Sequence, residues 1–162
     1  MKNILLIVLI SFSISACKKD KTCPDHFSGS NCDVQETPTN IFLKSVTVTD
    51  YSETDAGAGW DISSGPDIYL SIVHDGVEIY NNSASFIQNS VGSKTFTVNL
   101  ALPSVSDFYT IRLLDYDDFD ADDFMGGIQN VFYFSSDGFP SNVTFECPGC
   151  PVAFTCSIAH TF

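Results

Sequence analysis

The segment LLDYDDFDADDFMGG, residues 113–127, contains six aspartates between Asp115 and Asp123. Carboxylates so close together repel one another, and a bound cation would relieve that repulsion. Ca²⁺ takes about six to eight oxygen ligands and tolerates irregular geometry, so aspartates on a loop suit it better than they suit Mg²⁺. The spacing of the aspartates must decide between a calcium loop and an ordinary solvated connection.

The acidic segment does not have the spacing of an EF-hand. Counted from Asp115, the fifth position is Phe119, the sixth is Asp120 and the twelfth is Gly126. An EF-hand needs an oxygen ligand, a glycine and a bidentate glutamate at these three positions. Its flanking residues also have strand character instead of helical character. A different loop geometry must bring the carboxylates together.

A second acidic segment, GWDISSGPDIYLSIV, places Asp61 and Asp67 six residues apart, directly before a strand-like run. In the first segment Asp115 and Asp117 are followed by Asp123, six residues after Asp117, and then by an apolar pair and Gly126. Together the two segments resemble the first and third calcium loops of C2 domains, over about residues 42–134.

The resemblance to C2 domains implies a β-sandwich with Ca²⁺ at one end. The implied ligands are the carboxylates of Asp61, Asp67, Asp115, Asp117 and Asp123, with the carbonyls of Trp60 and Tyr116 as further donors. Asp118, Asp120 and Asp122 fall outside the pattern, as a solvated rim or as groups that support the ligands.

C2 domains mostly bind membranes or proteins through these loops, with calcium bridging to an anionic surface. The resemblance therefore implies calcium-dependent attachment to a membrane, a glycan or a protein, with Ile62 and Phe119 as apolar loop tips that contact a membrane. The lysine cluster with which many C2 domains hold phosphoinositides is missing from the run VEIYNN, residues 77–82. A surface or adhesion protein whose acidic loops bind no metal is the alternative.

Eight short segments rich in β-branched and aromatic residues lie between clusters of Gly, Pro, Asn, Asp and Ser. They cover residues 41–50, 67–73, 77–82, 95–100, 108–116, 127–134, 142–147 and 153–162. The connections are too short for helical crossovers, so the sequence predicts an all-β fold, an antiparallel eight-stranded sandwich over residues 41–162.

The first residues, MKNILLIVLISFSISAC, have one lysine, an apolar run and small residues before Cys17, as a secretory signal does. The end of this segment, ISAC, resembles a bacterial lipoprotein signal, which implies cleavage after residue 16 and lipid attachment to Cys17. The mature protein would then be exported and anchored to the bacterial cell envelope, with residues 17–40 as a polar tether.

Within the tether, CPDHFSGSNC resembles the last disulfide loop of an EGF-like module, with His26 where that family usually has glycine. The resemblance implies a small hairpin closed by a bond between Cys23 and Cys32.

The cysteines near the C-terminus, Cys147, Cys150 and Cys156, allow three interpretations. With His160 they have the ligand types of a zinc site, and the C-x-x-C spacing is that of a redox pair. In an exported protein disulfides are the stronger expectation, and we favour a bond between Cys147 and Cys156.

The net charge of −13, from 7 basic and 20 acidic residues, argues against binding of nucleic acid. The sequence contains no nucleophile elbow, no H-E-x-x-H motif and no glycine-rich phosphate loop. His26, His74 and His160 are isolated in sequence. These features favour a binding module over an enzyme.

Overall fold

The structure, a computed structural model, describes residues 22–55, 57–60, 64–118, 121–135 and 138–162. The chain divides into two compact units, Met1–Gln35 and Glu36–Phe162. None of the described residues belongs to a helix that is long and apolar enough to cross a membrane.

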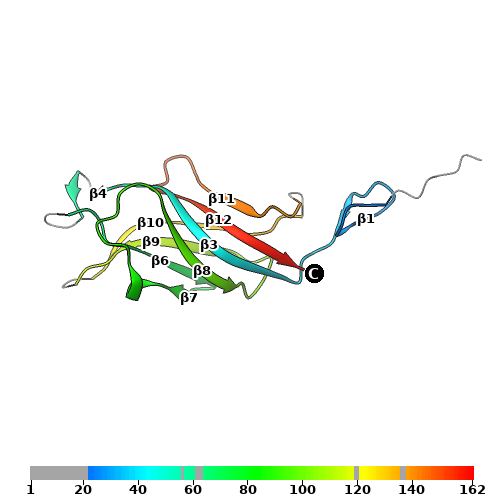
Figure 1. The fold of residues 1–162 in the computed structure, drawn as a ribbon, viewed down its shortest axis with the longest axis horizontal. Coiled ribbons are helices and arrows are strands. Elements are labelled where there is room, and N and C mark those ends of the chain that lie inside the picture. The colour runs from blue at the N-terminus through cyan, green and yellow to red at the C-terminus, as the bar shows by residue number, and fades with distance from the viewer. Residues whose placement is uncertain (1–21, 56, 61–63, 119–120, 136–137) are drawn as a thin grey trace, which may run out of the picture. The chain divides into compact units, whose positions relative to one another are not determined.

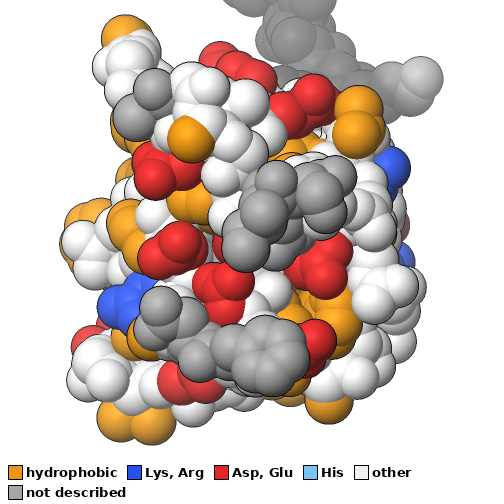
Figure 2. All heavy atoms as spheres, turned by 90° about the vertical axis from the view of Figure 1, so that its left-hand side faces the viewer, with side chains coloured by type: hydrophobic (Ala, Val, Ile, Leu, Met, Phe, Trp, Pro, Cys, Tyr) orange, Lys and Arg blue, Asp and Glu red, His pale blue; other side chains and the backbone are white. Residues whose placement is uncertain are grey.

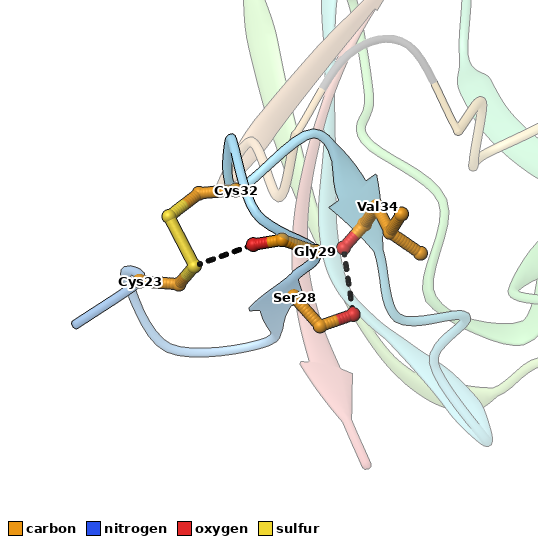
Figure 3. The surroundings of a disulfide bond; sticks show 5 residues. All are labelled: Cys23, Ser28, Gly29, Cys32 and Val34. Atoms are coloured by element: carbon orange, nitrogen blue, oxygen red, sulfur yellow. Dashed lines mark hydrogen bonds between the residues drawn. A yellow bond between two sulfur atoms is a disulfide. The ribbon is translucent and has the colours of Figure 1, made fainter. Parts of the chain in front are cut away.

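The first unit contains a small hairpin of β1 (Phe27–Ser28) and β2 (Val34–Gln35). A disulfide joins Cys23 to Cys32, the pair expected from the sequence, and Ser28 Oγ donates to the Val34 carbonyl (3.4 Å), as Figure 3 shows. Gly29 has φ +86°, and a Cβ there would lie 2.8 Å from Asp33 Oδ1, so the turn requires glycine.

The second unit is a sandwich of two four-stranded sheets in the part of the chain that the structure describes. One sheet has the order β10-β9-β6-β7 and the other β11-β12-β3-β8, and all their pairings are antiparallel. The strands are β3 (Asn40–Tyr51), β6 (Ile68–His74), β7 (Val77–Asn81), β8 (Lys94–Ala101), β9 (Tyr109–Asp115), β10 (Asp123–Asn130), β11 (Asn142–Phe145) and β12 (Val152–Thr161). The predicted antiparallel β-sandwich is confirmed.

The core of the sandwich forms because apolar residues alternate along the strands, as a strand with one buried face requires. In β9, Tyr109, Ile111 and Leu113 are fully buried, while Arg112 between them is exposed. Strand β6 is buried along Ile68–Val73, and in its sheet it lies between β9 and β7. This pair, β6 and β9, carries the residues of chemical interest at both of its ends.

Two elements differ from the sequence prediction. The strand expected over 127–134 begins earlier, at Asp123, because Asp123 pairs with Asp115 and Phe124 with Leu114 before a bulge at Gly126. The bulge needs glycine, since a Cβ on Gly126 would lie 2.8 Å from Pro151 Cγ and Val152 Cγ1. A short hairpin, β4 (Thr54–Asp55) with β5 (Ala58–Gly59), lies in the connection between β3 and β6. Figure 1 shows the sandwich strands running lengthwise, so that their connections gather at two ends.

Candidate metal sites at the two ends of the sandwich

The acidic end, which we define by Asp67, Asp115, Asp117, Asp122 and Asp123, is positioned by strand register. Asp115 is the last residue of β9, and its partners are Ile68 at the start of β6 and Asp123 at the start of β10. Asp67 directly precedes Ile68. The register thus brings Asp67, Asp115 and Asp123 to the same end of one sheet. Figure 2 shows Asp and Glu side chains gathered over this end, with Lys and Arg only near its margin.

Asp115 binds the backbone of Asp67 from inside the protein. Its side chain is fully buried, and its Oδ1 accepts the Asp67 backbone N–H at 2.5 Å. The Tyr116 N–H in turn donates to the Asp67 carbonyl at 2.8 Å. These bonds extend the β6–β9 ladder by one residue, and they fix the backbone of Asp67 against that of Tyr116.

The carboxylate of Asp67 connects β6 to the loop before β8. Its Oδ1 accepts the backbone N–H of Asn89 at 2.7 Å, and Asn89 has φ +48°, a conformation that asparagine tolerates better than most residues. The next N–H in the loop, that of Ser90, donates to the Pro66 carbonyl at 2.7 Å. The buried Ser90 hydroxyl shares a 2.7 Å hydrogen bond with Tyr51.

Asp122 connects the β9–β10 loop to the outer face of β6. Tyr69 Oη donates to Asp122 Oδ2 at 2.6 Å, and Asp122 Oδ1 accepts the Asp117 backbone N–H at 3.2 Å. Burial raises the pKa of Tyr69, and the hydrogen bond to the Asp122 carboxylate raises it further, so the phenol stays protonated and donates. Asp122, one of the three aspartates outside the ligand pattern, therefore supports the backbone of the predicted ligand Asp117.

Of the other residues predicted for this end, the structure describes Trp60 and Tyr116. Trp60 packs against the core and donates its Nε1–H to the Ser52 carbonyl at 2.9 Å. The Tyr116 ring stacks on Phe86 with centroids 4.3 Å apart. Asp61, Ile62 and Phe119, like Cys17 and Asp120, lie outside the described residues. The complete predicted calcium set therefore stays a prediction.

The opposite end of the same strand pair, the histidine end, consists of His74, Asp75 and Asp107. His74 Nε2 lies 2.9 Å from Asp107 Oδ2 and 3.6 Å from Asp75 Oδ2. Among the described residues, these three form the one group of His, Cys, Asp and Glu side chains with potential ligand atoms all within 4.8 Å of one another. From the sequence alone His74 was isolated, because its partner Asp107 is distant along the chain.

A sequence signal for the histidine end exists once the pairing of β6 with β9 is assumed. The register places His74 opposite Tyr109, and Asp107 lies two residues before Tyr109. The dipeptide Asp75-Gly76 after His74 is a strong hairpin signal, and both residues have positive φ, 49° and 77°. The hairpin and the pairing together bring the two aspartates to the imidazole.

The C-terminal cysteines pair differently from the expectation. Cys147 is bonded to Cys150 and not to Cys156, which is free and fully buried in the core. Strand register explains the difference: Cys156 lies opposite Val143 within the β11–β12 pair, whereas Cys147 comes after the last paired residue, Phe145. Burial raises the pKa of the Cys156 thiol to about 12.

His160 does not join these cysteines. Its ring contacts Tyr133 and Phe139, with centroids 6.2 and 5.6 Å away, and burial lowers its pKa. The described residues therefore do not assemble the zinc site that the sequence had left open.

No family model matches the chain, and no curated protein matches it. Among solved structures, C2 domain A of plant Extended Synaptotagmin 1 is similar with 11% identity and a TM-score of 0.49, over 78% of this chain and 97% of that one. A C2 domain protein from Ramazzottius varieornatus is similar with 12% identity and a TM-score of 0.43, over 75% of this chain and 89% of that one.

Human GIVD cytosolic phospholipase A2 is similar with 14% identity and a TM-score of 0.47, over 77% of this chain but only 17% of that protein. The strand pairing itself defines the chain as an antiparallel β-sandwich.

Proposed function

We propose that the acidic end binds Ca²⁺ and that the calcium-loaded loops attach the protein to a membrane, glycan or protein surface. The ligands are the carboxylates of Asp61, Asp67, Asp115, Asp117 and Asp123, with the carbonyls of Trp60 and Tyr116. We further propose that the protein is a binding module and not an enzyme, exported and anchored to the cell envelope by lipid on Cys17.

The observation that carries the calcium proposal is the direct cross-strand pairing of Asp115 with Asp123, next to Asp67. Like charges opposite each other on paired strands destabilise a sheet. Asp115 is also fully buried, and burial disfavours the ionised form of a carboxylate. A divalent cation would offset both costs, and Ca²⁺ accepts the irregular oxygen set that strand ends and loops provide.

The surface proposal follows from the charge of the protein. Its net charge of −13 gives it a long-range repulsion from anionic surfaces. Calcium bound at the acidic end would reverse that repulsion locally and would bridge to phosphate, sulfate or carboxylate groups on the partner. Ile62 and Phe119 would add apolar contact if that partner is a membrane.

Calorimetric titration with calcium tests the first step. We expect a dissociation constant on the order of 10⁻⁴ to 10⁻³ M, as for other extracellular calcium modules. At ten times that concentration, calcium stabilises the fold by about 1.4 kcal/mol and raises Tm by about 5 °C. Asp67→Asn abolishes both effects but keeps an oxygen that accepts the Asn89 N–H, so the loop geometry survives.

Asp118→Asn is the control, because Asp118 lies in the other acidic loop, next to Asp117, is exposed and falls outside the ligand pattern. It leaves the calcium response intact. A melting curve of the unmodified protein that does not change in millimolar calcium contradicts the proposal.

Sedimentation with vesicles tests the second step. The protein is expressed from residue 18, so that neither the signal nor an acyl chain contributes. We expect calcium-dependent binding to vesicles that contain phosphatidylserine and none to pure phosphatidylcholine. Calcium binding without vesicle binding directs the search to acidic glycans or proteins.

One observation favours the alternative, a surface or adhesion lipoprotein without functional metal binding. Asp67, Asp115 and Asp122 all accept hydrogen bonds that hold their loops together without a cation. On this alternative the acidic end is a hydrogen-bonded connection, and calcium changes neither Tm nor vesicle binding.

A further inference from the structure

We propose that the histidine end is a second, chemically different metal site, which takes a borderline divalent cation of the Zn²⁺ type through His74, Asp75 and Asp107. The site is independent of the acidic end, because it lies at the other end of β6 and β9. It differs from an acidic cluster because one of its three ligands is an imidazole nitrogen.

Three backbone features bring the ligands together. Strand β6 ends at His74, and the positive-φ pair Asp75 and Gly76 turns the chain directly into β7, with His74 opposite Val77. On its other side His74 pairs with Tyr109, so that the loop before β9 places Asp107 beside the turn. The ligands therefore come from a tight hairpin and an adjacent loop, both fixed by the sheet.

The distances between the ligand atoms fit a tetrahedral ion. Zinc binds nitrogen and oxygen at about 2.0 to 2.2 Å, so neighbouring ligand atoms of a tetrahedral site lie about 3.4 Å apart. The two distances from His74 Nε2, 2.9 Å to Asp107 and 3.6 Å to Asp75, lie on either side of that value. All three ligand atoms lie within 4.8 Å of one another, so side-chain rotations would bring them around one ion.

The imidazole is already oriented for this role. Its ring stacks on Tyr109 with centroids 4.8 Å apart and planes 19° apart. Tyr109 is fully buried, and its hydroxyl donates to the Ser104 carbonyl at 2.6 Å and accepts the Ser104 N–H at 2.9 Å. The stacking partner is thus held at both the ring and the hydroxyl.

The surroundings leave room for the rest of a coordination sphere. Asp75 and Asp107 line an open cavity of about 460 Å³, together with Ser106, Thr110 and Gln129. The side chain of His74 is only 14% exposed, while those of Asp107 and Asp75 are 42% and 80% exposed. An ion that enters from solvent would contact the carboxylates first. Once bound, it would keep at least one coordination position open for water or an external ligand.

Ligand type separates the two ends. Imidazole suits Zn²⁺, Ni²⁺ and Cu²⁺, whereas Ca²⁺ binds oxygen almost exclusively. The histidine end therefore selects a transition metal, and the all-oxygen acidic end selects calcium. The thiols of the described chain are withdrawn from competition, because Cys156 is buried and the remaining described cysteines form disulfides.

Titration of the purified protein with Zn²⁺, without a polyhistidine tag and with calcium present, tests the proposal. We expect one zinc ion bound, and His74→Gln and Asp107→Asn each lower the affinity at least about tenfold. His26→Asn and Asp55→Asn are the matched controls, because they change the same residue types outside the site, and they leave the affinity unchanged.

Two further measurements separate a metal site from a structural ion pair. Asp75→Asn removes the negative charge of an exposed side chain and tolerates the positive φ of this turn position, so it retains the fold, shown by an unchanged melting temperature without metal, yet weakens zinc binding. Zinc addition shifts the ring resonances of His74 and not those of His160. The proposal is overturned if the unmodified protein binds no zinc, or if His74→Gln and Asp75→Asn bind it as the unmodified protein does.

Discussion

The two ends of the β6–β9 pair use the same strand register for different arrangements of charge. At the acidic end the register sets aspartate against aspartate, and donors to these carboxylates in the described residues include backbone N–H groups and the Tyr69 hydroxyl. At the histidine end an imidazole lies between two carboxylates. Strand pairing thus decides where polar groups meet, while the residue types decide which ion each end can hold.

The largest expected effect is on Asp115, which the acidic end buries completely. Asp115→Ala leaves the Asp67 N–H without its acceptor and lowers the free energy of unfolding by about 1 to 3 kcal/mol in EDTA. Urea denaturation measures the loss, with Asp118→Ala as the exposed control. An equal effect of the two substitutions would show that burial does not distinguish them.

Tyr69→Phe tests whether Asp122 supports the acidic end. Removing the phenol breaks one hydrogen bond and costs about 0.5 to 1.5 kcal/mol. Calcium affinity also falls, because Asp122 no longer holds the Asp117 backbone in place. Calorimetry and urea denaturation measure the two effects.

Tyr80→Phe is the matched control for Tyr69→Phe, since the Tyr80 hydroxyl donates to the Thr97 carbonyl, away from both ends. It leaves calcium affinity unchanged. Loss of calcium binding in both variants would remove the specific role of Asp122.

Asp107 gives the histidine end a distinct pH dependence. The hydrogen bond from His74 lowers the pKa of Asp107 below its ordinary value of 3.8. A lowered folded-state pKa stabilises the fold fully above the unfolded value, and this stabilisation disappears as pH falls through the folded value. Melting curves of the unmodified protein and Asp107→Asn therefore differ above pH 4 and converge on acidification below it. Curves that converge only on raising the pH would contradict this assignment.

The smallest expected effect is the coupling between the two ends. Asp67→Asn leaves zinc affinity unchanged, and His74→Gln leaves calcium affinity unchanged, because sites without shared partners are additive within about 0.5 kcal/mol. Titration of each ion against the other end's variant measures the coupling. A change larger than this would mean that the sheet transmits strain between its ends.

The sequence was sufficient to predict the parts of the fold that follow from local patterns. Short segments rich in β-branched and aromatic residues predicted the sandwich, and the resemblance to C2 loops implied that Asp67, Asp115 and Asp123 lie at one end. The register places the backbones of these three residues at one end, because Asp67 directly precedes β6, Asp115 ends β9 and Asp123 begins β10, while their role as calcium ligands stays a prediction.

Features that depend on non-local register were not predictable. The contact of His74 with Asp107 requires knowledge that β6 pairs with β9 in a particular alignment. The bond between Cys147 and Cys150 depends on where β11 ends, and the sequence of such a short strand does not define its last paired residue. The bulge at Gly126 likewise depends on the neighbouring strand β12, because Val152 limits the space there.

The buried thiol of Cys156 has a consequence for how the fold would behave in the oxidising compartment that we propose for this protein. With a pKa of about 12, only about one thiol in 10⁵ is ionised at pH 7, and the thiolate is the species that attacks disulfides. Once β12 has packed, disulfide shuffling that involves Cys156 stops for lack of a nucleophile. If the protein is exported, as we propose, an odd cysteine is compatible with a stable fold, provided that the sandwich folds before Cys147 and Cys150 are oxidised.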